Sequence, residues 1–353
     1  MNRLSNPLCL DCTTRSLKPL ILVLLFSAIV AAQATGSAHA APLRAGVARI
    51  DITNTDVPLV NDKLYAKALA IKSDDQTVVV VTIDAVAIAE IGSIKNSFLG
   101  NVRAQLRKDI GLDPTSLVIN ASHCHGVVCS DIEQRTVKGV KAALKNLVPV
   151  DVGVGIGHED RIMENRRLKL KSGREADVRH AYSLPADEEV VGVGPVDPQI
   201  GIMRLDRKDG TTLAVVYQFA CHPIQGVPNG GNTADITGFS SRVIEDNLSE
   251  GTIALFLQGC GGDINPVQYK DVNNPRDAEP LGNMLGLSVL RALRKIPAKP
   301  PTHFGLINEK LKLPRADLAE RIELLESETQ RLLRSLAGTS LNLKTFLPLA
   351  VKY

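Results

Sequence analysis

The stretch V-I-N-A-S-H-C-H-G, Val118–Gly126, decides how the chain is organised. An apolar run that ends in small polar residues is typical of a buried strand, and α/β proteins build their sites where such strands end. His123 and His125 follow this end, one residue apart. Side chains at i and i+2 share one side of an extended backbone, so we expect both imidazoles to face one cavity and Cys124 to point away. Imidazole is a common metal ligand, so the pattern indicates a metal site; two unrelated polar loop residues are the alternative.

A second strand end repeats this arrangement. The apolar run Leu213–Ala220 continues into F-A-C-H-P, which places His222 at the edge of the predicted sheet. Asp209-Gly210 is typical of a hairpin turn and joins this run to the strand before it. His222 alone would fit a structural role. Together with the H-x-H pair it favours a metal site, and we predict that the ring of His222 lies close to that of His123.

Strands and helices alternate along the chain. The β-branched run T-V-V-V-V-T-I-D, Thr77–Asp84, is typical of a strand covered on both faces. Its last residue, Asp84, either orients a histidine or caps a turn. Helical spacing of apolar residues occurs in four stretches, Ile94–Ile110, Ile132–Leu147, Ile236–Leu248 and Ala278–Ile296. This alternation predicts an α/β fold, with a mixed β-sheet core flanked by helices and the site at strand carboxyl ends.

Three further stretches complete the prediction. Lys171–Gly194, rich in charge and glycine, is expected to be a surface excursion. Thr302–Leu313 is predicted to be a strand. Leu318–Leu336 is predicted to be a charged amphipathic helix, with alternating charges on a solvated face.

A glycine-rich segment, Q-G-C-G-G-D-I-N-P at Gln258–Pro266, follows another short apolar run. Three glycines in four residues indicate a close approach of the backbone to another group. The segment matches neither G-x-G-x-x-G nor the phosphate loop that ends in Lys-Ser/Thr, which argues against a nucleotide. We interpret it as a tight turn that lines the same cavity as the histidines.

Composition excludes some partners. The chain has 353 residues, 44% of them hydrophobic and 22% charged, which is ordinary for a globular protein. Aromatic residues make up 3% and tryptophan is absent, so a stacking surface for nucleic acid is not expected. A net charge of +3 also argues against a polyanionic partner. Contact with a membrane surface and the oligomeric state are left open.

The first forty residues are predicted to be a signal peptide. A basic start is followed by the apolar stretch Pro19–Ala32, which is short for a membrane span, and by the small-x-small pattern at Ala38-His39-Ala40. An uncleaved anchor is the alternative. We therefore expect a secreted or periplasmic protein whose mature chain begins near Ala41. Export permits oxidation, so its four cysteines are expected to be disulfides or inert thiols; these are Cys124, Cys129, Cys221 and Cys260.

Taken in order, S-H-C-H-G, N-R, F-A-C-H-P, D-x-x-G-F and Q-G-x-G-G-D-I-N-P resemble the amino-terminal catalytic domain of the neutral/alkaline (non-lysosomal) ceramidases. The resemblance runs from about Val47 to Pro297. It implies that His123 and His222 are zinc ligands and that His125 faces the substrate. It also implies that Arg166 contacts the reacting group.

The sequence departs from the family in two places. Asn265 stands where the family has a catalytic serine, and an amide cannot act as that nucleophile, although it can donate a hydrogen bond to an oxyanion. The family also takes a glutamate and a tyrosine as zinc ligands from a later region. No segment like the one that carries these two ligands occurs before Tyr353. The resemblance therefore implies either that 41–353 is a catalytic domain truncated at its C-terminus, which we favour, or that the metal site is incomplete.

Three hypotheses follow. The first is an exported, Zn²⁺-dependent hydrolase of an amide bond in a small-molecule or lipid-like N-acyl substrate, in which metal-activated water attacks the carbonyl. In it, His123 and His222 hold the metal, and the catalytic residues are His125, Arg166 and Asn265. The second is an inactive exported homologue that binds a lipid or glycan. The third, a structural zinc or redox domain, is disfavoured because the mature chain lacks C-x-x-C spacing.

Overall fold

The computed structural model describes residues 42–57, 62–178, 185–226, 232–267, 277–309, 311–312, 314 and 316–336. It divides into two compact units, 1–306 and 307–353, which are described separately. The expected signal peptide, Met1–Ala40, lies outside the described residues, so its function stays a prediction. Among the helices in the described part of the chain, none combines the length and the apolar character needed to cross a membrane.

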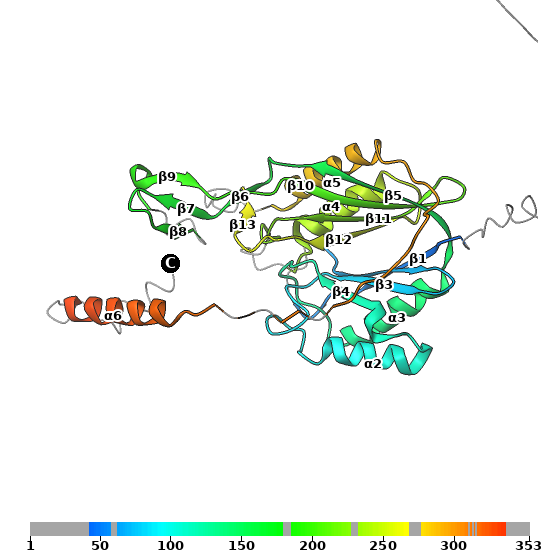
Figure 1. Ribbon diagram of the computed structural model, residues 1–353, viewed down its shortest axis with the longest axis horizontal. Coiled ribbons are helices and arrows are strands. Elements are labelled where there is room, and N and C mark those ends of the chain that lie inside the picture. The colour runs from blue at the N-terminus through cyan, green and yellow to red at the C-terminus, as the bar shows by residue number, and fades with distance from the viewer. Residues whose placement is uncertain are drawn as a thin grey trace, which may run out of the picture. The chain divides into compact units, whose positions relative to one another are not determined.

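The first unit is an α/β structure built on a mixed sheet of eight strands (Figure 1). The strand order is β12-β11-β10-β5-β1-β2-β3-β4. The pairs β3–β4 and β11–β12 are parallel and the others are antiparallel. This confirms the predicted fold class and the β10–β11 hairpin. The strands are β1 Arg44–Asp51, β2 Tyr65–Lys72, β3 Thr77–Ile83, β4 Leu117–Ala121, β5 Val148–His158, β10 Gln199–Arg207, β11 Thr212–Phe219 and β12 Ile253–Gln258.

Four helices flank this sheet: α2 Phe98–Ile110, α3 Ile132–Lys145, α4 Asp235–Asp246 and α5 Glu279–Leu293. A short ladder joins β6 Met163–Asn165 to β13 Ile264–Pro266. The expected surface excursion carries strands: with β7 Arg167–Leu170, the strands β8 Glu175–Asp177 and β9 Val190–Val193 form a small sheet. Short 3-10 helices cover Pro114–Ser116 and Asp187–Glu189. The second unit contains α6, Ala319–Leu336.

One predicted strand is wrong. The described residues of Thr302–Leu313 form no strand. Within this stretch Phe304 is half-buried and packs against a hydrophobic cluster of the first unit. Phe304 thus serves packing rather than a sheet, and the apolar residues Ile307 and Leu311 of the same stretch are exposed.

The large sheet bends back on itself, so that its two halves face each other. β1 pairs with β5 only at Arg44 and Ala45, and beyond this corner the half β1–β4 diverges from the half formed by β5 and β10–β12. Apolar side chains from both halves share one core, including Val47, Leu69 and Val216. Helices α2 and α3 cover the outer face of one half, and α4 and α5 cover the outer face of the other (Figure 1).

Strand β12 lies at an edge of the sheet, and polar side chains of the facing half bind its backbone. Thr82 Oγ1 donates to Phe256 O at 2.8 Å, Lys67 Nζ donates to Ala254 O at 2.9 Å, and Asn120 Nδ2 donates to Phe256 O at 3.3 Å. These bonds satisfy carbonyl groups that an edge strand leaves unpaired. They also hold the carboxyl ends of β3 and β4 next to those of β11 and β12.

The packing of α3 on β1 depends on Gly46. A Cβ atom there would lie 2.2 Å from Ala143 O and 2.8 Å from Asn146 C, both backbone atoms of α3 and its end. We expect Gly46→Ala to lower the free energy of unfolding by about 1–3 kcal/mol, because the helix must move away from the sheet. Chemical denaturation measures this loss. The control is Gly100→Ala in α2, where a Cβ meets nothing within 4 Å, and its stability should be equal or higher. Equal effects at both positions would contradict the prediction.

Candidate metal centre

Three histidines meet where the two pairs of parallel strands end. His123 follows β4 and His222 follows β11, and their Nε2 atoms are 3.1 Å apart. The ring of His125 lies 5.8 Å from each of the other two rings, which are 4.4 Å apart. One ligand atom from each histidine lies within 4.8 Å of the others. His125 is exposed and the other two are half-buried. The three rings could therefore hold a metal ion with one side open to solvent.

The backbone reaches this geometry in a way that the sequence did not predict. His123 has φ 67°, in the left-handed region, so the H-x-H segment is not the extended backbone on which the expectation rested. A non-glycine residue in this region is uncommon, and such strain occurs often at functional sites. His123 N donates to Ala85 O at 3.0 Å, which holds the turn. Cys124 is fully buried in the core, on the side away from the rings, as expected.

Backbone carbonyls orient two of the rings. His123 Nδ1 lies 2.6 Å from Val86 O, and His222 Nδ1 lies 3.2 Å from Gly261 O. A carbonyl oxygen can only accept, so in both rings Nδ1 carries the hydrogen and Nε2 is left with its lone pair. Histidines that bind metals are held in this way. Two nitrogens bound to a tetrahedral zinc ion are about 3.3 Å apart, given bonds of about 2.0–2.1 Å, so the observed spacing fits such an ion.

The surroundings also keep His222 in the neutral form that binds metals. Burial, followed by the charge of His123, lowers the pKa of His222 to about 4, although its bond to Gly261 O acts in the opposite direction. His125 and Arg166 contribute in the same direction as burial. The imidazole is therefore unprotonated at neutral pH, which metal ligation requires.

The glycine-rich segment packs against the strand end that carries His222. A Cβ at Gly259 would lie 2.0 Å from Gln218 Nε2 and 3.0 Å from Phe219 O, and a Cβ at Gly261 would lie 3.1 Å from Cys221 C. The backbone of the glycine-rich segment therefore makes the expected close approach, and the group that it approaches is the end of β11. This contact brings Gly261 O to the ring of His222.

Asn265 and Arg166 lie beside the histidines. His222 N donates to Ile264 O at 2.9 Å, which places β13 next to this histidine. Asn265 is completely buried, and both polar atoms of its side chain lack a hydrogen-bond partner. Arg166 is 9% exposed, its Nε is 3.1 Å from Asp177 Oδ1, and its charge acts on the pKa of His222. The structure thus brings the three histidines together and places Asn265 and Arg166 in segments next to His222, and the chemical roles of all five residues stay predictions.

Some contributions to the site carry no signal in the sequence. The carbonyls of Val86 and Gly261 orient the rings, and every residue type has such a group. For Asp84, the hydrogen bond favours the role of a cap: its Oδ2 accepts from Tyr65 N at 2.9 Å at the ends of their strands. The four described cysteines of the mature chain are free thiols, and none belongs to the histidine cluster.

A second polar cluster lies between β1, β2 and α4. Its lining comprises Arg49, Asp62, Lys63, Tyr65, Lys67, Asp84, Gly238, Arg242 and Glu245. Glu245 binds Arg49 Nη1 at 2.6 Å and Lys67 Nζ at 3.1 Å. Asp62 accepts from Thr233 Oγ1 and from Ala234 N. The charged groups bind one another and join α4 to the sheet, so we interpret the cluster as structural.

Burial, and secondarily the charge of Asp84, raises the pKa of Asp62 from 3.8 to about 6. The folded protein therefore binds this proton more tightly than the unfolded chain, and stability falls as the pH rises from about 4 to 6. In Asp62→Asn the fall should be smaller, by up to about 3 kcal/mol. Urea denaturation at pH 4 and pH 7 measures the difference. Asp209→Asn should instead make the fall in stability with rising pH larger. Hydrogen bonds from Thr211 lower the pKa of Asp209, so this carboxylate stabilises the folded protein as the pH rises. Identical pH profiles for Asp62→Asn and the wild type would contradict this prediction.

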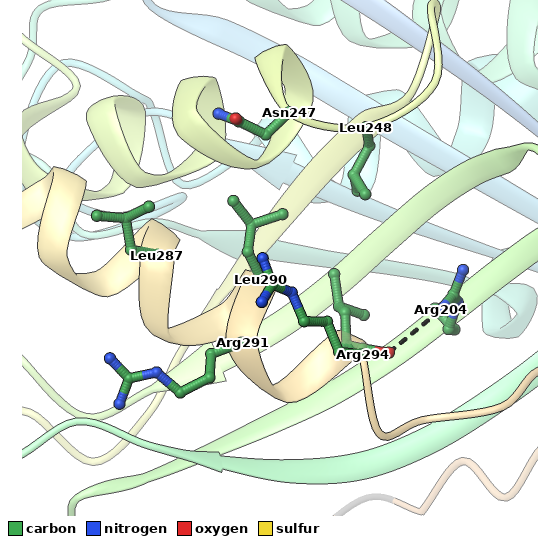
Figure 2. A pocket seen from close by; sticks show the side chains of 8 residues that line it. Arg204, Asn247, Leu248, Leu287, Leu290, Arg291 and Arg294 are labelled. Carbon is green, nitrogen blue, oxygen red and sulfur yellow. Dashed lines mark hydrogen bonds between the residues drawn. The ribbon is translucent and has the colours of Figure 1, made fainter.

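Another hollow lies at the carboxyl ends of α4 and α5 (Figure 2). Leu248, Leu287 and Leu290 supply apolar walls. Arg204 Nη1 donates to Leu293 O at 3.2 Å and to Ile296 O at 3.3 Å, and so caps the end of α5. The eight lining residues include no carboxylate, thiol or imidazole. This hollow therefore stabilises a helix end and offers no group for acid–base or metal chemistry.

No family model matches the chain, and no curated protein sequence matches it. Solved structures do match. A neutral ceramidase from Pseudomonas aeruginosa is similar with a TM-score of 0.57 and 18% identity, over 72% of this chain and 45% of that protein. A ceramidase described as complexed with C2 gives a TM-score of 0.57 and 17% identity, over 72% of this chain and 44% of the other. The chain thus spans less than half the length of either neighbour, and what it shares with them is a ceramidase-like fold.

Proposed function

We propose that this protein is a zinc-dependent hydrolase of an amide bond in an N-acyl substrate. The observation that carries the proposal is the meeting of His123, His125 and His222, with ligand atoms within 4.8 Å of one another. Two of the rings are anchored through Nδ1 so that Nε2 faces the shared point. The fold that the chain shares with two ceramidases supports the choice of an amide bond.

Each of the five residues has a separate role in the proposed reaction. His123 and His222 would hold a zinc ion, which would supply a water of lowered pKa, about 7, and a positive charge that polarises a carbonyl group. His125 is the exposed member of the group and is placed to carry a proton between water and the leaving nitrogen. Arg166 stabilises negative charge on the former carbonyl oxygen, and Asn265 Nδ2 orients the carbonyl by donating a hydrogen bond.

We further propose that the protein works outside the cytoplasm. The basic start, the apolar stretch and the small residues that follow them support export. Sequencing the amino terminus of the exported protein tests this directly. A mature protein that begins near Ala41 is expected, and a retained Met1 would contradict cleavage.

A second candidate function is the binding of a lipid or glycan without turnover. The observation that favours it is the amide of Asn265, which cannot act as a nucleophile and which lies buried with both polar atoms unpartnered. A bound ligand would satisfy these atoms in a binding protein just as a substrate would in an enzyme.

Metal analysis combined with a hydrolysis screen separates the two functions. The secreted protein is purified without chelators, its metal content is measured, and it is incubated with a panel of N-acyl amides before and after zinc is removed and restored. The proposal expects about one zinc per chain, and release of the acyl group that stops on removal and returns on restoration. Bound zinc without hydrolysis of any substrate would favour the binding function, and absence of bound metal would overturn the metal centre.

A further inference from the structure

Helix α6 (Figure 1) of the second unit carries an apolar stripe with the spacing of a coiled coil. Its members follow one another at alternating intervals of four and three residues: Leu318, Ile322, Leu325, Thr329 and Leu332. In a heptad repeat written abcdefg, residues with this spacing occupy the a and d positions and form one seam along the helix. Ile322 and Thr329 take a positions, and the three leucines take d positions. Ile322 N donates to Leu318 O at 2.9 Å, so the repeat includes the residue that precedes the helix.

This seam is open to water. Its four apolar members, Leu318, Ile322, Leu325 and Leu332, are 45–56% exposed. At the remaining position, Thr329 Oγ1 donates to Leu325 O at 2.7 Å, which satisfies the hydroxyl within the helix and leaves the methyl group to the seam. Helices of this length are stabilised mainly by the packing of an apolar face, so the open seam indicates a partner.

The residue types along the seam favour one kind of partner. β-Branched residues at a positions combined with leucine at d positions favour two parallel strands over three or four. Here both a positions, Ile322 and Thr329, are β-branched, and every d position is leucine. A second copy of α6 presents the same seam, so the two helices can bury these side chains against each other around a twofold axis.

Charges beside the seam favour the parallel orientation. Arg321 occupies a g position, and Glu326, five residues later, occupies the next e position. In a parallel pair these positions meet across the interface, so Arg321 of each helix faces Glu326 of the other. An antiparallel pair that aligned the whole seam would instead place Glu326 against Glu326 and Glu328 against Glu328. Like charges that face each other oppose association, so the charge pattern selects the parallel arrangement.

The same charges argue against a membrane surface as the partner. Amphipathic helices that lie on membranes are rich in lysine and arginine on their polar face. Helix α6 has four glutamates, three arginines and no lysine. Its polar face therefore has a slight negative charge, which offers no attraction to anionic lipids.

We propose that α6 pairs with α6 of a second copy as a parallel two-stranded coiled coil, so that the protein is a homodimer. This inference is independent of the proposed hydrolase function, because none of the residues that carry it belongs to the histidine cluster.

Sedimentation of the full chain tests the dimer. It is measured over protein concentrations from about 1 to 100 µM, since a helix pair this short is expected to bind weakly. We expect the mass to rise from that of one chain to that of two. Leu325→Lys should raise the dissociation constant by at least about 100-fold, because it places a charge in the seam. The control is Leu287→Lys on α5, which is 55% exposed outside the seam and should keep the wild-type value. A wild-type protein that stays monomeric, a trimer, or a dimer that survives Leu325→Lys would each overturn the inference.

A charge exchange tests the pairing without altering the seam. Arg321→Glu and Glu326→Arg should each raise the dissociation constant by about 10-fold, because each places like charges together at two symmetry-related points. The double variant restores the attraction with its signs exchanged, so it should return to near the wild-type value. All of these side chains are exposed, and circular dichroism should show the helix content unchanged. A double variant as weak as the single variants would overturn the parallel pairing.

A cysteine introduced into the seam tests the orientation. In the parallel pair position 332 of one helix faces position 332 of the other, whereas in the antiparallel pair it would face position 322. With the exposed Cys260 replaced by serine, Leu332→Cys should form a disulfide-linked dimer under mild oxidation. Ser327→Cys, at an f position on the outer side of the helix, is the control and should remain monomeric under denaturing conditions. Absence of a link at position 332, or equal linking at both positions, would overturn the parallel coiled coil.

Discussion

His222→Ala is expected to abolish both stoichiometric zinc binding and amide hydrolysis. The Nε2 atom of His222 is 3.1 Å from that of His123, and alanine would leave only two of the three rings. Loss of residues that merely orient a metal ligand costs about 10–100-fold in affinity, so we expect the loss of a ligand to cost at least about 100-fold. His123→Ala should have the same effect. The double variant should lower zinc binding and hydrolysis little further than either single variant, because the two rings act as one unit. Metal analysis after dialysis and assays at saturating substrate measure both losses.

The matched control is His158→Ala. His158 lies at the end of β5, is 62% exposed in its side chain and pairs with Asp160 at 3.3 Å. Its removal should leave metal content and hydrolysis at wild-type values. Circular dichroism and thermal unfolding should show that all variants remain folded, since the three replaced rings lie at strand ends or on the surface. A His222→Ala protein that still binds one zinc per chain would show that the metal centre is elsewhere.

Arg166→Met is expected to lower kcat by about 100–1000-fold with a smaller change in KM. Removing one donor that stabilises charge in the transition state has an effect of this size. Arg166 is 9% exposed and its charge acts on His222, so water screens it poorly. Arg166→Lys should recover part of the loss, because lysine keeps the charge but lacks the planar guanidinium group.

Arg167→Met is the control for this experiment. Arg167 is the next residue, begins β7 and binds Asp263 Oδ2 at 3.2 Å, with 46% of its side chain exposed. Its replacement should leave kcat close to that of the wild type. A similar loss of kcat in both variants would mean that these arginines support the folded structure of the segment and that Arg166 has no specific role in the transition state. An effect of Arg166→Met on KM alone would mean that Arg166 binds the substrate without stabilising the transition state.

Features that depend on short stretches of chain were predictable. The run of valines in β3 predicted a strand covered on both faces, and in the structure Val79 and Val81 pack under α2 while Thr82 binds β12 on the other side. The two apolar runs that end in histidine predicted that both strands stop at the site. Hydrophobic periodicity and turn residues determine local structure over a few positions, so these features can be predicted from the sequence.

The predictions failed where an element depends on distant neighbours. Thr302–Leu313 has the apolar content of a strand, but its described residues find no partner strand, and Phe304 packs on a core instead. Lys171–Gly194 has the composition of a loop, yet two short strands within it pair with β7. In both places strand formation was decided by whether a partner with free hydrogen-bonding groups lay alongside.

The sequence by itself determined the order of the large-sheet strands and of the helices that flank them, and the presence of an imidazole at the end of β4 and of β11. Only the tertiary structure decided that these ends meet, through the bend of the sheet and the bonds of Thr82 and Asn120 to the edge of β12. It also decided the left-handed turn at His123 and the pairing of Glu164 with Asn265. The physical reason is that periodicity shows which side of a strand is buried. The partner of that side is set by contacts between distant segments, such as Thr82 and Phe256, which are 174 residues apart in the sequence.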